Sequence, residues 1–422
     1  MPGSTISELA ASIAANTALV SDFLSSKNIP TPSFTVDAPS SSQIPSDALE
    51  IEAARVAVID DTLKLRDLML GPRDYLMTFT HDELISQQAI CRFKLMSAVP
   101  VHGQSSYADI AAQTGISEQT VRRLLRHAMT KRLFCEPQKG IVAHTAASRL
   151  LAEDSQLADW VGASTDDLWQ AAAQTVNAMV KFPRSQEPNE TGFALANNSS
   201  KDAFSILGEH PDRALRFRSA MKAWTEGSGY DLKYLVESFP WQDIGDGTVV
   251  DVGGSNGFVC TRLAAEFPGL HFVVQDLEPV IHGAEAAIDE TLRGRIRFMP
   301  YNFLKERQPV PNAELYFFRW IFHNWSDKYC KIILQNLIPA LKPGARIVIM
   351  DNVLPEPGIL PLWQEERLRS MDLTMMEMQN SLERGLDEWE KLFSNVDSRF
   401  KFKGGTMPKG SRLWILEVQW DT

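Results

Sequence analysis

The chain has 422 residues and carries 42 lysines and arginines against 53 aspartates and glutamates, a formal net charge of -11. With 44% hydrophobic and 23% charged residues, the composition is that of a globular protein and excludes a disordered chain or a coiled rod. The length predicts two or three domains, the acidic balance argues against a nucleic-acid partner, and no apolar run is long enough to span a membrane.

The four cysteines lie far apart, form no CxxC motif and have no histidine at metal-ligand spacing. This pattern indicates reduced intracellular thiols and disfavours a disulfide scaffold. The first twenty residues carry no basic segment ahead of their small apolar residues, so they are a poor secretory signal. We therefore expect a cytoplasmic protein with no membrane partner and no bound metal.

Two helices are expected in residues 1–70. Apolar residues at helical spacing predict one helix from about Ser4 to Ser26 and another from Ala48 to Leu70, which should stop at Gly71 and Pro72. Between them, residues 28–47 are rich in proline and serine and are typical of a linker or an extended strap. Because such helices have little core of their own, we expect them to pack on something else, such as a partner subunit.

Residues 71–160 contain the pattern of a winged helix-turn-helix. After Ser105 come a helix, a turn at Gly115, a helix capped by Ser117, and two short β-like runs around residues 137–140. The second helix bears three arginines, Arg122, Arg123 and Arg126. Two interpretations stay open: a DNA-reading helix, or a structural winged helix that packs against another domain or subunit.

Residues 161–240 are predicted to form a helical connector that is unusually rich in aromatic residues. Such residues are more often core than pocket, and they line a substrate only if a catalytic site faces them. The aromatic residues in and just before this connector are Trp160, Trp169, Phe182, Phe193, Phe204, Phe217, Trp224 and Tyr230.

Residues 241–422 open with a unit typical of nucleotide-binding α/β sheets. The run Thr248–Val252 is apolar almost throughout, as expected of a buried parallel strand. Gly253, Gly254 and Gly257 then form a tight turn into a helix, Phe258–Glu266, where side chains would block the approach of a ligand to the backbone.

An acid follows this unit at a meaningful spacing. A second strand, His271–Gln275, leads to Asp276, which lies 23 residues after Gly253, the spacing at which an acid meets ribose hydroxyls. The turn lacks the Lys-Ser/Thr of a P-loop and departs from the G-x-G-x-x-G of nicotinamide enzymes. Strand, turn, helix, strand and acid together indicate an adenosyl ligand.

The turn sequence DVGGSNG, residues 251–257, resembles motif I of the class I S-adenosylmethionine-dependent methyltransferases. The resemblance implies a Rossmann-like α/β domain with S-adenosylmethionine as cofactor. It places Asp276 on the ribose hydroxyls, with Leu277 beside it, and brings the turn that follows Asp251 close to the methionine portion.

A second constellation lies downstream. A strand, Glu314–Phe318, leads to a turn bearing His323, a helix from Ser326 to Leu341, and a strand, Arg346–Met350, that ends at Asp351. Ligands of open α/β sheets sit at the carboxyl ends of the strands. Four polar residues are predicted to share this rim: Asp251, Asp276, His323 and Asp351.

The stretch FRWIFHNWSD, residues 318–327, closely resembles the catalytic segment of the small-molecule O-methyltransferases of the plant caffeate and fungal polyketide type. The resemblance runs from about Leu68 to Trp420 and includes the winged-helix region and the segment PDRALRFRSAM. It implies that His323 is the general base and that Asp351 and Glu383 are the two accompanying acids. A phenol of pKa about 10 keeps its proton near neutrality, whereas histidine near 6.5 is mostly neutral and can accept it.

The same resemblance assigns further cofactor contacts. Arg319 and Trp320 match residues that line the cofactor behind the base, and Asn302 and Phe303 match the segment that reads the adenine. Asn302 departs from the family, which commonly has aspartate there. An amide oxygen can still accept a hydrogen bond from the adenine amino group.

The substrate wall is predicted from two segments. Met221 and Trp224 lie in the segment that the family uses to close over the cofactor, and Met375 and Met376 belong to a methionine-rich helix that would give a deformable apolar wall. Asn324 stands after the base, where the family commonly has an aspartate that helps to orient the substrate.

Three functions remain open from the sequence. The favoured one is S-adenosylmethionine-dependent O-methylation of a hydroxylated aromatic or polyketide-type secondary metabolite. The second is a cyclase or pericyclase of the same fold that binds the cofactor without methyl transfer, and Asn302 and Asn324 keep it open. The third, a DNA-binding regulator, is disfavoured by the acidic chain and its complete catalytic half. The family uses its winged-helix domain for dimerisation, which implies a homodimer with a shared active-site wall.

Overall fold

The computed structural model describes residues 5–45, 47–225 and 229–421. Ser4, the predicted start of the first helix, and positions 226–228 of the predicted connector lie outside the described residues. The chain forms two compact units. The first comprises Met1–Gln170, Leu207–Trp224 and Pro357–Arg367, and the second comprises Ala171–Ile206, Thr225–Glu356 and Leu368–Thr422. Within the described residues, no helix is both long enough and apolar enough to cross a membrane.

The first unit begins with two helices that pack on each other. Helix α1 (Ile6–Ser26) is capped by Thr5 in a reciprocal capping box with Glu8, and helix α2 (Leu49–Leu76) follows the strap. The predicted end of the helical run at Gly71 corresponds to a break inside α2, which consists of two helical stretches joined at this non-helical residue. Gly71 adopts a left-handed φ of 70° and kinks the helix, but the helix resumes at once, since proline is tolerated in the first turn of a helix.

A small winged-helix fold follows, as the sequence predicts. Its core lies under three helices and a three-stranded sheet of order β1-β3-β2. The elements are α3 (Ile85–Arg92), η1 (Leu95–Ala98), β1 (Gln104–Ser106), α4 (Tyr107–Thr114), α5 (Glu118–Thr130), β2 (Cys135–Gln138) and β3 (Ile141–Ala143). Helix α4 ends at Gly115, with a left-handed φ of 74°, and Ser117 caps α5 through the N–H of Thr120.

The basic helix α5 is partly neutralised by acids of its own domain. Arg126 forms a bidentate pair with Glu136, with nitrogen–oxygen distances of 2.8 Å, and Arg122 lies 3.6 Å from Glu118. These contacts favour the structural interpretation of the winged helix over DNA reading.

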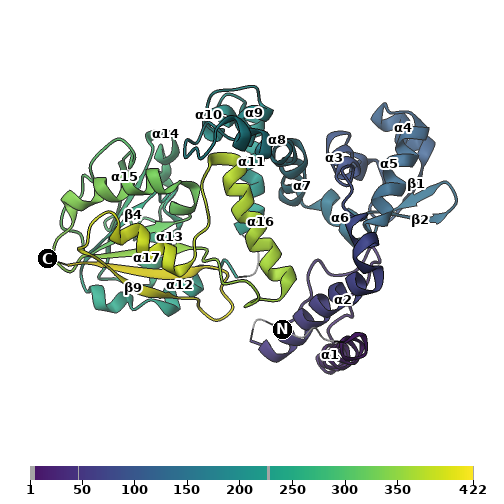
Figure 1. The fold of residues 1–422 in the computed structure, drawn as a ribbon, viewed down its shortest axis with the longest axis horizontal. Coiled ribbons are helices and arrows are strands. Elements are labelled where there is room, and N and C mark those ends of the chain that lie inside the picture. Colours follow the sequence, from purple (N-terminus) through teal and green to yellow (C-terminus); the bar gives the residue numbers. More distant parts are fainter. Residues whose placement is uncertain (1–4, 46, 226–228, 422) are drawn as a thin grey trace. The chain divides into compact units, whose positions relative to one another are not determined.

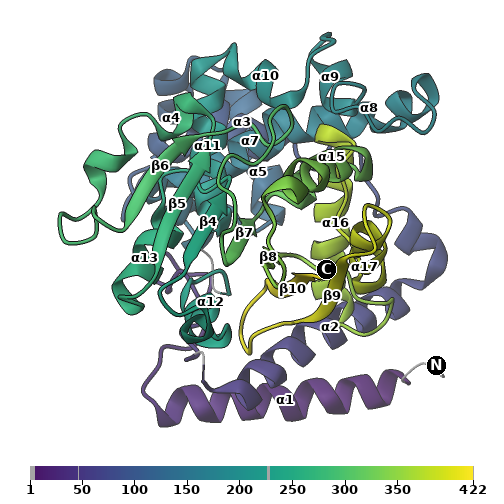
Figure 2. The same cartoon turned by 90° about the vertical axis from the view of Figure 1, so that its left-hand side faces the viewer.

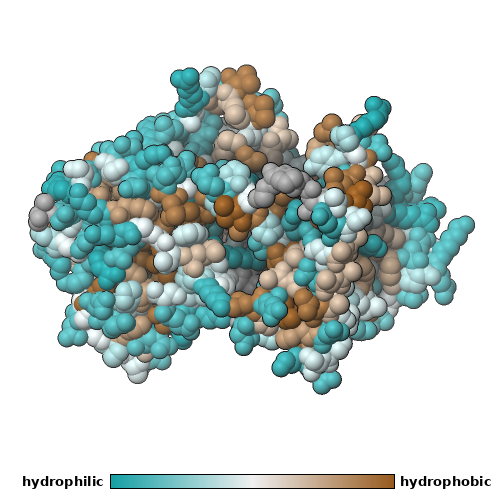
Figure 3. Space-filling model, turned by 60° about the horizontal axis from the view of Figure 1, so that its bottom comes forward, coloured by the Kyte–Doolittle hydropathy of each residue, from teal (hydrophilic) through white to brown (hydrophobic). Residues whose placement is uncertain are grey.

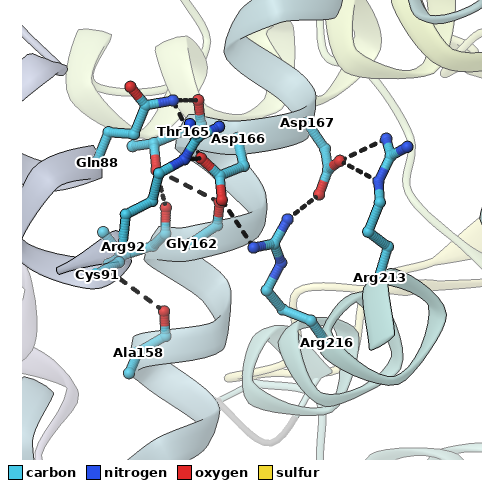
Figure 4. A network of polar contacts seen from close by, with 11 residues as sticks. Gln88, Cys91, Arg92, Ala158, Gly162, Thr165, Asp166, Asp167, Arg213 and Arg216 are labelled. Carbon is cyan, nitrogen blue, oxygen red and sulfur yellow. Dashed lines mark hydrogen bonds and ion pairs between the residues drawn. The ribbon is translucent and has the colours of Figure 1, made fainter. Parts of the chain in front are cut away.

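A buried ion cluster braces the first unit around a π-helical turn (Ser164–Leu168), which lies between α7 (Ser155–Ala163) and α8 (Trp169–Lys181). Figure 4 shows Asp166 and Asp167 of this turn pointing toward arginines from two other helices. Arg92 of α3 lies 2.6 Å from Asp166, whereas Arg216 of α11 (Pro211–Thr225) lies 2.7 Å from Asp166 and 2.8 Å from Asp167. Arg213 lies 2.7 Å from Asp167. The cluster ties α3, the π-helical turn and α11 together.

The second unit is built on a seven-stranded sheet of order β6-β5-β4-β7-β8-β10-β9. Strands β4 to β8 run parallel, and β10 is antiparallel to both β8 and β9 (Figure 2). The strands are β4 (Thr248–Val252), β5 (His271–Asp276), β6 (Ile296–Pro300), β7 (Leu315–Arg319), β8 (Arg346–Asp351), β9 (Phe400–Thr406) and β10 (Trp414–Trp420). This arrangement confirms the Rossmann-like α/β prediction.

Alternating strand residues fill two cores, one on each face of the sheet. Phe318 belongs to the core under α15 and α17, whereas its neighbour Phe317 belongs to the core under α12 and α13.

The remaining elements of the two units are α6 (Ala146–Glu153), α9 (Gly192–Ala196), α10 (Ala203–Gly208), α12 (Lys233–Ser238), η3 (Trp241–Ile244), α13 (Phe258–Glu266), α14 (Glu278–Ile281), η4 (Ala284–Ala287), η5 (Phe322–Asn324), α15 (Asp327–Leu337), η6 (Ile338–Ala340), α16 (Leu362–Gln379) and α17 (Leu386–Ser394) (Figure 1). The helix expected over residues 326–341 is therefore an α-helix followed by a 3₁₀ turn.

Candidate active site

The catalytic residues expected from the sequence meet at the carboxyl edge of the sheet in the second unit. His323 lies in η5, directly after β7, and Asp351 is the last residue of β8. Glu383 comes from the loop between α16 and α17. All three are buried, with 7%, 0% and 2% of their surfaces exposed respectively. The structure thus brings together three side chains that are up to 60 residues apart in the chain.

The imidazole is held by Glu383 and its backbone by Asp351. Nδ1 of His323 lies 3.0 Å from Oε1 of Glu383, and the backbone N–H of His323 donates to Oδ2 of Asp351 at 3.3 Å. Asn352 also donates to Oε1 of Glu383, at 3.1 Å, and the backbone N–H of Glu383 donates to Asp372 at 2.8 Å. Nε2 of His323 forms no hydrogen bond with any described residue.

The electrostatics of this group favour an imidazole that can take up a proton. Burial opposes the charged form of His323, but the carboxylates of Asp351 and Glu383 outweigh burial, and Arg384 opposes them only in part, so the pKa of His323 is raised. Burial is also the main reason why the pKa of Asp351 is raised to about 6. A positive charge on the ring is therefore stabilised by acids placed around it before the reaction begins.

Arg384 fixes the loop that carries the histidine, a role that the sequence did not reveal. Its side chain is 1% exposed and donates to the carbonyl oxygens of Phe322 at 3.1 Å and Trp325 at 2.9 Å. It also forms an ion pair with Asp327 at 2.9 Å. The guanidinium thus pins both sides of the turn around His323.

Two further residues that support the site, Asn352 and Asp372, were missed as well. Asn352, Arg384 and Asp372 all act through neighbours that are distant in sequence. The one available signal was the position of Asn352, which follows Asp351 directly at the end of β8. A polar residue beside a predicted catalytic acid at a strand end was a candidate for this kind of support.

The glycine-rich turn is built as a cradle with no room for side chains. Gly253 and Gly257 have left-handed φ values of 79° and 75°. A methyl group on Gly254 would lie 2.6 Å from Oδ2 of Asp251, an impossible approach. Asp276 accepts the N–H of Ser255, in the turn, at 2.9 Å and that of Leu277 at 2.8 Å. The turn and the acid expected on the ribose are therefore locked to each other.

Buried polar groups near this turn fit a charged ligand. Asp251 is 2% exposed and accepts from Sγ of Cys260 at 3.3 Å, and burial raises its pKa to about 7. Arg319 donates to the carbonyl of Tyr230 at 3.2 Å, and burial lowers the pKa of its guanidinium to about 10. Nε of Arg319 is buried and has no hydrogen-bond partner among the residues described. An unpaired buried donor beside a glycine cradle is what a cofactor with polar groups requires.

The segment expected to read the adenine adjoins the same turn. A Cβ atom on Gly253 would lie 2.3 Å from Ile321 and 3.9 Å from the ring of Phe303. The turn, Phe303 and the start of the catalytic segment therefore converge. Asn302 uses its Oδ1 to accept the N–H of Leu304 at 3.1 Å, so its side-chain oxygen already supports the local turn.

The predicted substrate residues are distributed over both units of the chain. The side-chain amide of Asn324 donates to the carbonyl oxygen of Trp320 at 2.8 Å, within the turn that contains both residues. Met375 is 8% exposed, whereas Met376 lines a cavity of about 450 Å³ between α8 and α16, because successive helical side chains point about 100° apart. Met221 and Trp224 belong to the first unit, where Trp224 lies 4.7 Å from the ring of Trp160. Their substrate role stays a prediction.

The three residues predicted to be catalytic also have a spacing that could hold a metal ion. Among the described residues, ligand atoms of His323, Asp351 and Glu383 all lie within 4.8 Å of one another. Those ligands already serve the hydrogen bonds described above, and the expectation that no metal is needed stays a prediction.

Comparison with protein families agrees with this geometry. Residues 174–397 match the model of the O-methyltransferase domain, and residues 86–154 match that of the O-methyltransferase dimerisation domain. The chain is 41% identical to the grayanic acid biosynthesis cluster O-methyltransferase of Cladonia grayi, over 99% of this chain and 88% of that protein. It is 39% identical to O-methyltransferase pyvH of Aspergillus violaceofuscus, over 100% of both chains. The chlorophenol O-methyltransferase of Trichoderma longibrachiatum is 37% identical, over 98% of this chain and 90% of its own.

Solved structures share the fold. The crystal structure of OxaC superposes with a TM-score of 0.76 at 22% identity, covering 99% of each chain. The structure of LepI in complex with S-adenosylmethionine gives 0.70 at 23% identity, covering 98% of this chain and all of that one. The family and the fold expected from the sequence are thus confirmed. The chain belongs to the O-methyltransferase family, and it is an S-adenosylmethionine-dependent O-methyltransferase.

Proposed function

We propose that the protein methylates a phenolic hydroxyl of an aromatic or polyketide-derived secondary metabolite, with His323 as the general base. The observation that carries the proposal is the buried imidazole at the sheet edge, with Nδ1 bound to Glu383 and Nε2 without a hydrogen-bond partner among the residues that the structure describes. Such an arrangement presents one basic nitrogen to a substrate proton.

The chain's own residues would act in a fixed order. S-adenosylmethionine supplies a methyl group made electrophilic by its sulfonium. Nε2 of His323 takes the proton of the substrate hydroxyl, and the freed electron pair of that oxygen forms the new bond to the methyl carbon as the sulfur regains its own pair. Glu383 accepts a hydrogen bond from Nδ1–H and so fixes the tautomer of the imidazole. Asp351 stabilises the imidazolium that forms.

The cofactor residues are assigned by their positions in the cradle. We propose that Asp276 and Leu277 hold the ribose, and that Asn302 and Phe303 contact the adenine. The methionine portion would lie along Gly253, Gly254 and Gly257, with Asp251, Arg319 and Trp320 nearby. The support is the glycine cradle and the unpaired buried donor on Arg319.

The names of relatives and the predicted substrate residues both favour an aromatic methyl acceptor. Curated relatives are named for chlorophenol and for the grayanic acid biosynthesis cluster. The predicted wall consists of Met375, Met376, Met221, Trp224 and Asn324, which is apolar with one amide. An uncharged, flat, hydroxylated ring fits such a wall better than a charged metabolite does.

The test is a methylation assay with purified protein. A panel of simple phenols and hydroxylated polyketides is incubated with cofactor carrying a deuterated methyl group. The proposal predicts a labelled methyl ether and one S-adenosylhomocysteine for each product molecule. A labelled product with the methyl on carbon or nitrogen would contradict it.

A second candidate is a cyclase or pericyclase that keeps its cofactor intact. Two observations favour it: Asn302 and Asn324 replace the aspartates that the family commonly has, and the fold is shared with a structure titled a pericyclic reaction enzyme, at a TM-score of 0.69. It predicts an isomerised product with no S-adenosylhomocysteine released. The assay above therefore separates the two functions.

We further propose a homodimer. The dimerisation-domain match covers residues 86–154, and exposed apolar side chains precede it. Brown apolar patches are visible on the face drawn in Figure 3. The exposed large apolar residues on α2 and in the segment that follows it, up to Phe79, include Leu63, Leu68, Met69, Tyr75, Leu76, Met77 and Phe79. Apolar surface of this density favours a protein interface. Light scattering should give twice the monomer mass, and Leu68→Asp with Met69→Asp should halve it.

The domain limits stay a proposal. We propose four parts, with boundaries after residues 70, 160 and 240, in which residues 1–70 and 71–160 serve the dimer and residues 161–240 line the substrate. Limited proteolysis tests this division, since cleavage should concentrate near those boundaries. Cuts inside 241–422 at the same protease dose would contradict it.

A cytoplasmic location is proposed from the thiols. Cys260 and Cys330 are buried, Cys91 and Cys135 are half-buried, and none of the four forms a disulfide. Unpaired thiols persist in a reducing compartment. Fluorescence of a tagged chain should be diffuse through the cytoplasm, and a vesicular or cell-wall pattern would contradict the proposal.

A further inference from the structure

Trp320 adopts a backbone conformation that a tryptophan rarely takes. It follows β7 directly and has a left-handed φ of 58°. Its N–H donates to the carbonyl of Met350 at 3.2 Å, and its carbonyl accepts the side-chain amide of Asn324 at 2.8 Å. Both ends of the strained turn are therefore tied down. Strain of this kind costs stability and concentrates at functional sites.

The strained turn places the indole against the general base. The ring of Trp320 lies 4.8 Å from the ring of His323, centroid to centroid, at an interplanar angle of 52°. The ring of Tyr230 also packs against it, at 5.8 Å. Nε1 of Trp320 is buried and finds no hydrogen-bond acceptor in the part of the chain that the structure describes. The ring is thus positioned by its backbone and by packing, not by its own hydrogen bond.

We propose that Trp320 is a positioning residue for the general base, which holds the imidazole of His323 in place and stabilises the imidazolium formed when the base takes the substrate proton. This role rests on the proposed function of His323 and adds to it. An aromatic face attracts a cation within about 6 Å of its centroid, and it gains little from a neutral ring. The contact therefore strengthens as the reaction proceeds, which is the property that lowers a barrier.

Three charged groups act on the same imidazole. Glu383 binds Nδ1, Asp351 accepts the backbone N–H, and Arg384 opposes them from the loop behind. Trp320 differs from these groups because it carries no charge and touches the ring from the end of β7. Its contribution can therefore be removed without changing the net charge of the site.

Packing alone predicts the opposite response. If the indole only fills space, its loss admits water to a buried imidazole, relieves the cost of burying its charge and raises its pKa. If the indole stabilises the imidazolium, replacing it with an aliphatic side chain lowers that pKa. The direction of the shift distinguishes the two roles.

The experiment uses the full-length enzyme with Trp320→Phe and Trp320→Leu. The matched control is Trp241→Phe, which alters another buried indole of the second unit. The ring of Trp241 packs against the rings of Phe239, Phe267 and Phe317. We expect kcat at saturating cofactor to fall roughly 5- to 30-fold in the leucine variant and less in the phenylalanine variant. The acidic limb of kcat/KM should move to lower pH in the same order.

A titration of ¹⁵N-labelled histidine by NMR reports the imidazole without turnover. The resonance of His323 is identified by its loss in His323→Gln. A fall in its pKa from wild type through Trp320→Phe to Trp320→Leu supports the proposal even if the acceptor assay fails, so the two failures can be told apart. An unchanged or higher pKa in both variants, or a loss of kcat no larger than in Trp241→Phe, overturns it. If the leucine variant does not fold, the phenylalanine variant decides.

Discussion

Nδ1 of His323 lies 3.0 Å from Oε1 of Glu383, and this contact sets the direction in which the base works. The carboxylate accepts a hydrogen bond from Nδ1–H, so the proton of the neutral imidazole stays on Nδ1 and its lone pair is on Nε2. The tautomer is assigned by this contact. It joins the turn after β7 to the loop after α16, two segments that only the completed fold brings together.

Replacing Glu383 by glutamine should remove this control while keeping the shape of the site. The amide can present a donor to Nδ1, which stabilises the wrong tautomer. We expect kcat to fall by about 100-fold or more, with the dissociation constant of the cofactor little changed. Steady-state kinetics and calorimetry on the same preparation give both values.

Asp351→Asn is the matched comparison. Asp351 contacts the backbone N–H of His323 and not its ring, so it supports the imidazolium only through space. The loss of kcat should be smaller than in Glu383→Gln. An equal or larger loss in Asp351→Asn would show that the tautomer is not set by Glu383.

Gly254→Ala should weaken cofactor binding. Its methyl group would lie 2.6 Å from Oδ2 of Asp251 and 2.9 Å from Val274, and both neighbours belong to the rigid sheet. We expect the dissociation constant for the cofactor to rise by about 10-fold or more, because the turn must shift. Gly294→Ala is the control, since a methyl group there meets nothing within 4 Å. Equal cofactor affinities for the two variants would contradict the proposal that the glycine-rich turn holds the cofactor.

The pH dependence of the rate follows from the raised pKa of His323. The base must be neutral, so kcat/KM should rise with pH along a limb whose midpoint lies above 6.5, the ordinary value for histidine. A midpoint below 6.5 in the pH profile would show that burial outweighs the two acids.

The stability of the ligand-free protein should depend on pH through Asp251. Its folded pKa is raised to about 7 from 3.8, so the native state prefers the protonated acid. That contribution is fully present below 3.8 and is lost as pH rises through about 7. We expect Tm to fall as pH rises from 3.8 to about 7, and Asp251→Asn to flatten that fall. A slope unchanged by the substitution would exclude Asp251 as its source.

Local sequence signals predict part of the fold and of the site, whereas contacts between residues distant in the chain are not visible in the sequence. Strand β4 and helix α13 have the predicted bounds, because local periodicity and the glycine turn determine them. The continuation of α2 beyond Gly71 was missed, since a glycine-proline pair is compatible with both a stop and a kink. The three-residue strand β1 is too short for its alternation to be visible. Arg384 could not be assigned, because its acceptors lie 59 and 62 residues away.

The ion cluster of the first unit should matter for stability. The side chain of Asp167 is 2% exposed and faces Arg213 and Arg216. Asp167→Asn should destabilise the fold by about 1.5–3 kcal/mol, because it removes a buried carboxylate that accepts charge-assisted hydrogen bonds from Arg213 and Arg216. Denaturant unfolding measures this change. The exposed pair of Asp387 and Lys391 offers the control, where Asp387→Asn should leave the free energy of unfolding nearly unchanged. Equal changes in the free energy of unfolding for the two substitutions would contradict a stabilising role for the ion cluster.

The central claim is that His323 removes the substrate proton, and His323→Gln tests it most directly. The experiment is a single-turnover methyl transfer with an accepted phenol, run beside a titration of S-adenosylmethionine binding on the same protein. Our account predicts a methyl-transfer rate at least about 100-fold lower, with the dissociation constant of the cofactor within about threefold of wild type. Methyl transfer within tenfold of the wild-type rate would contradict it.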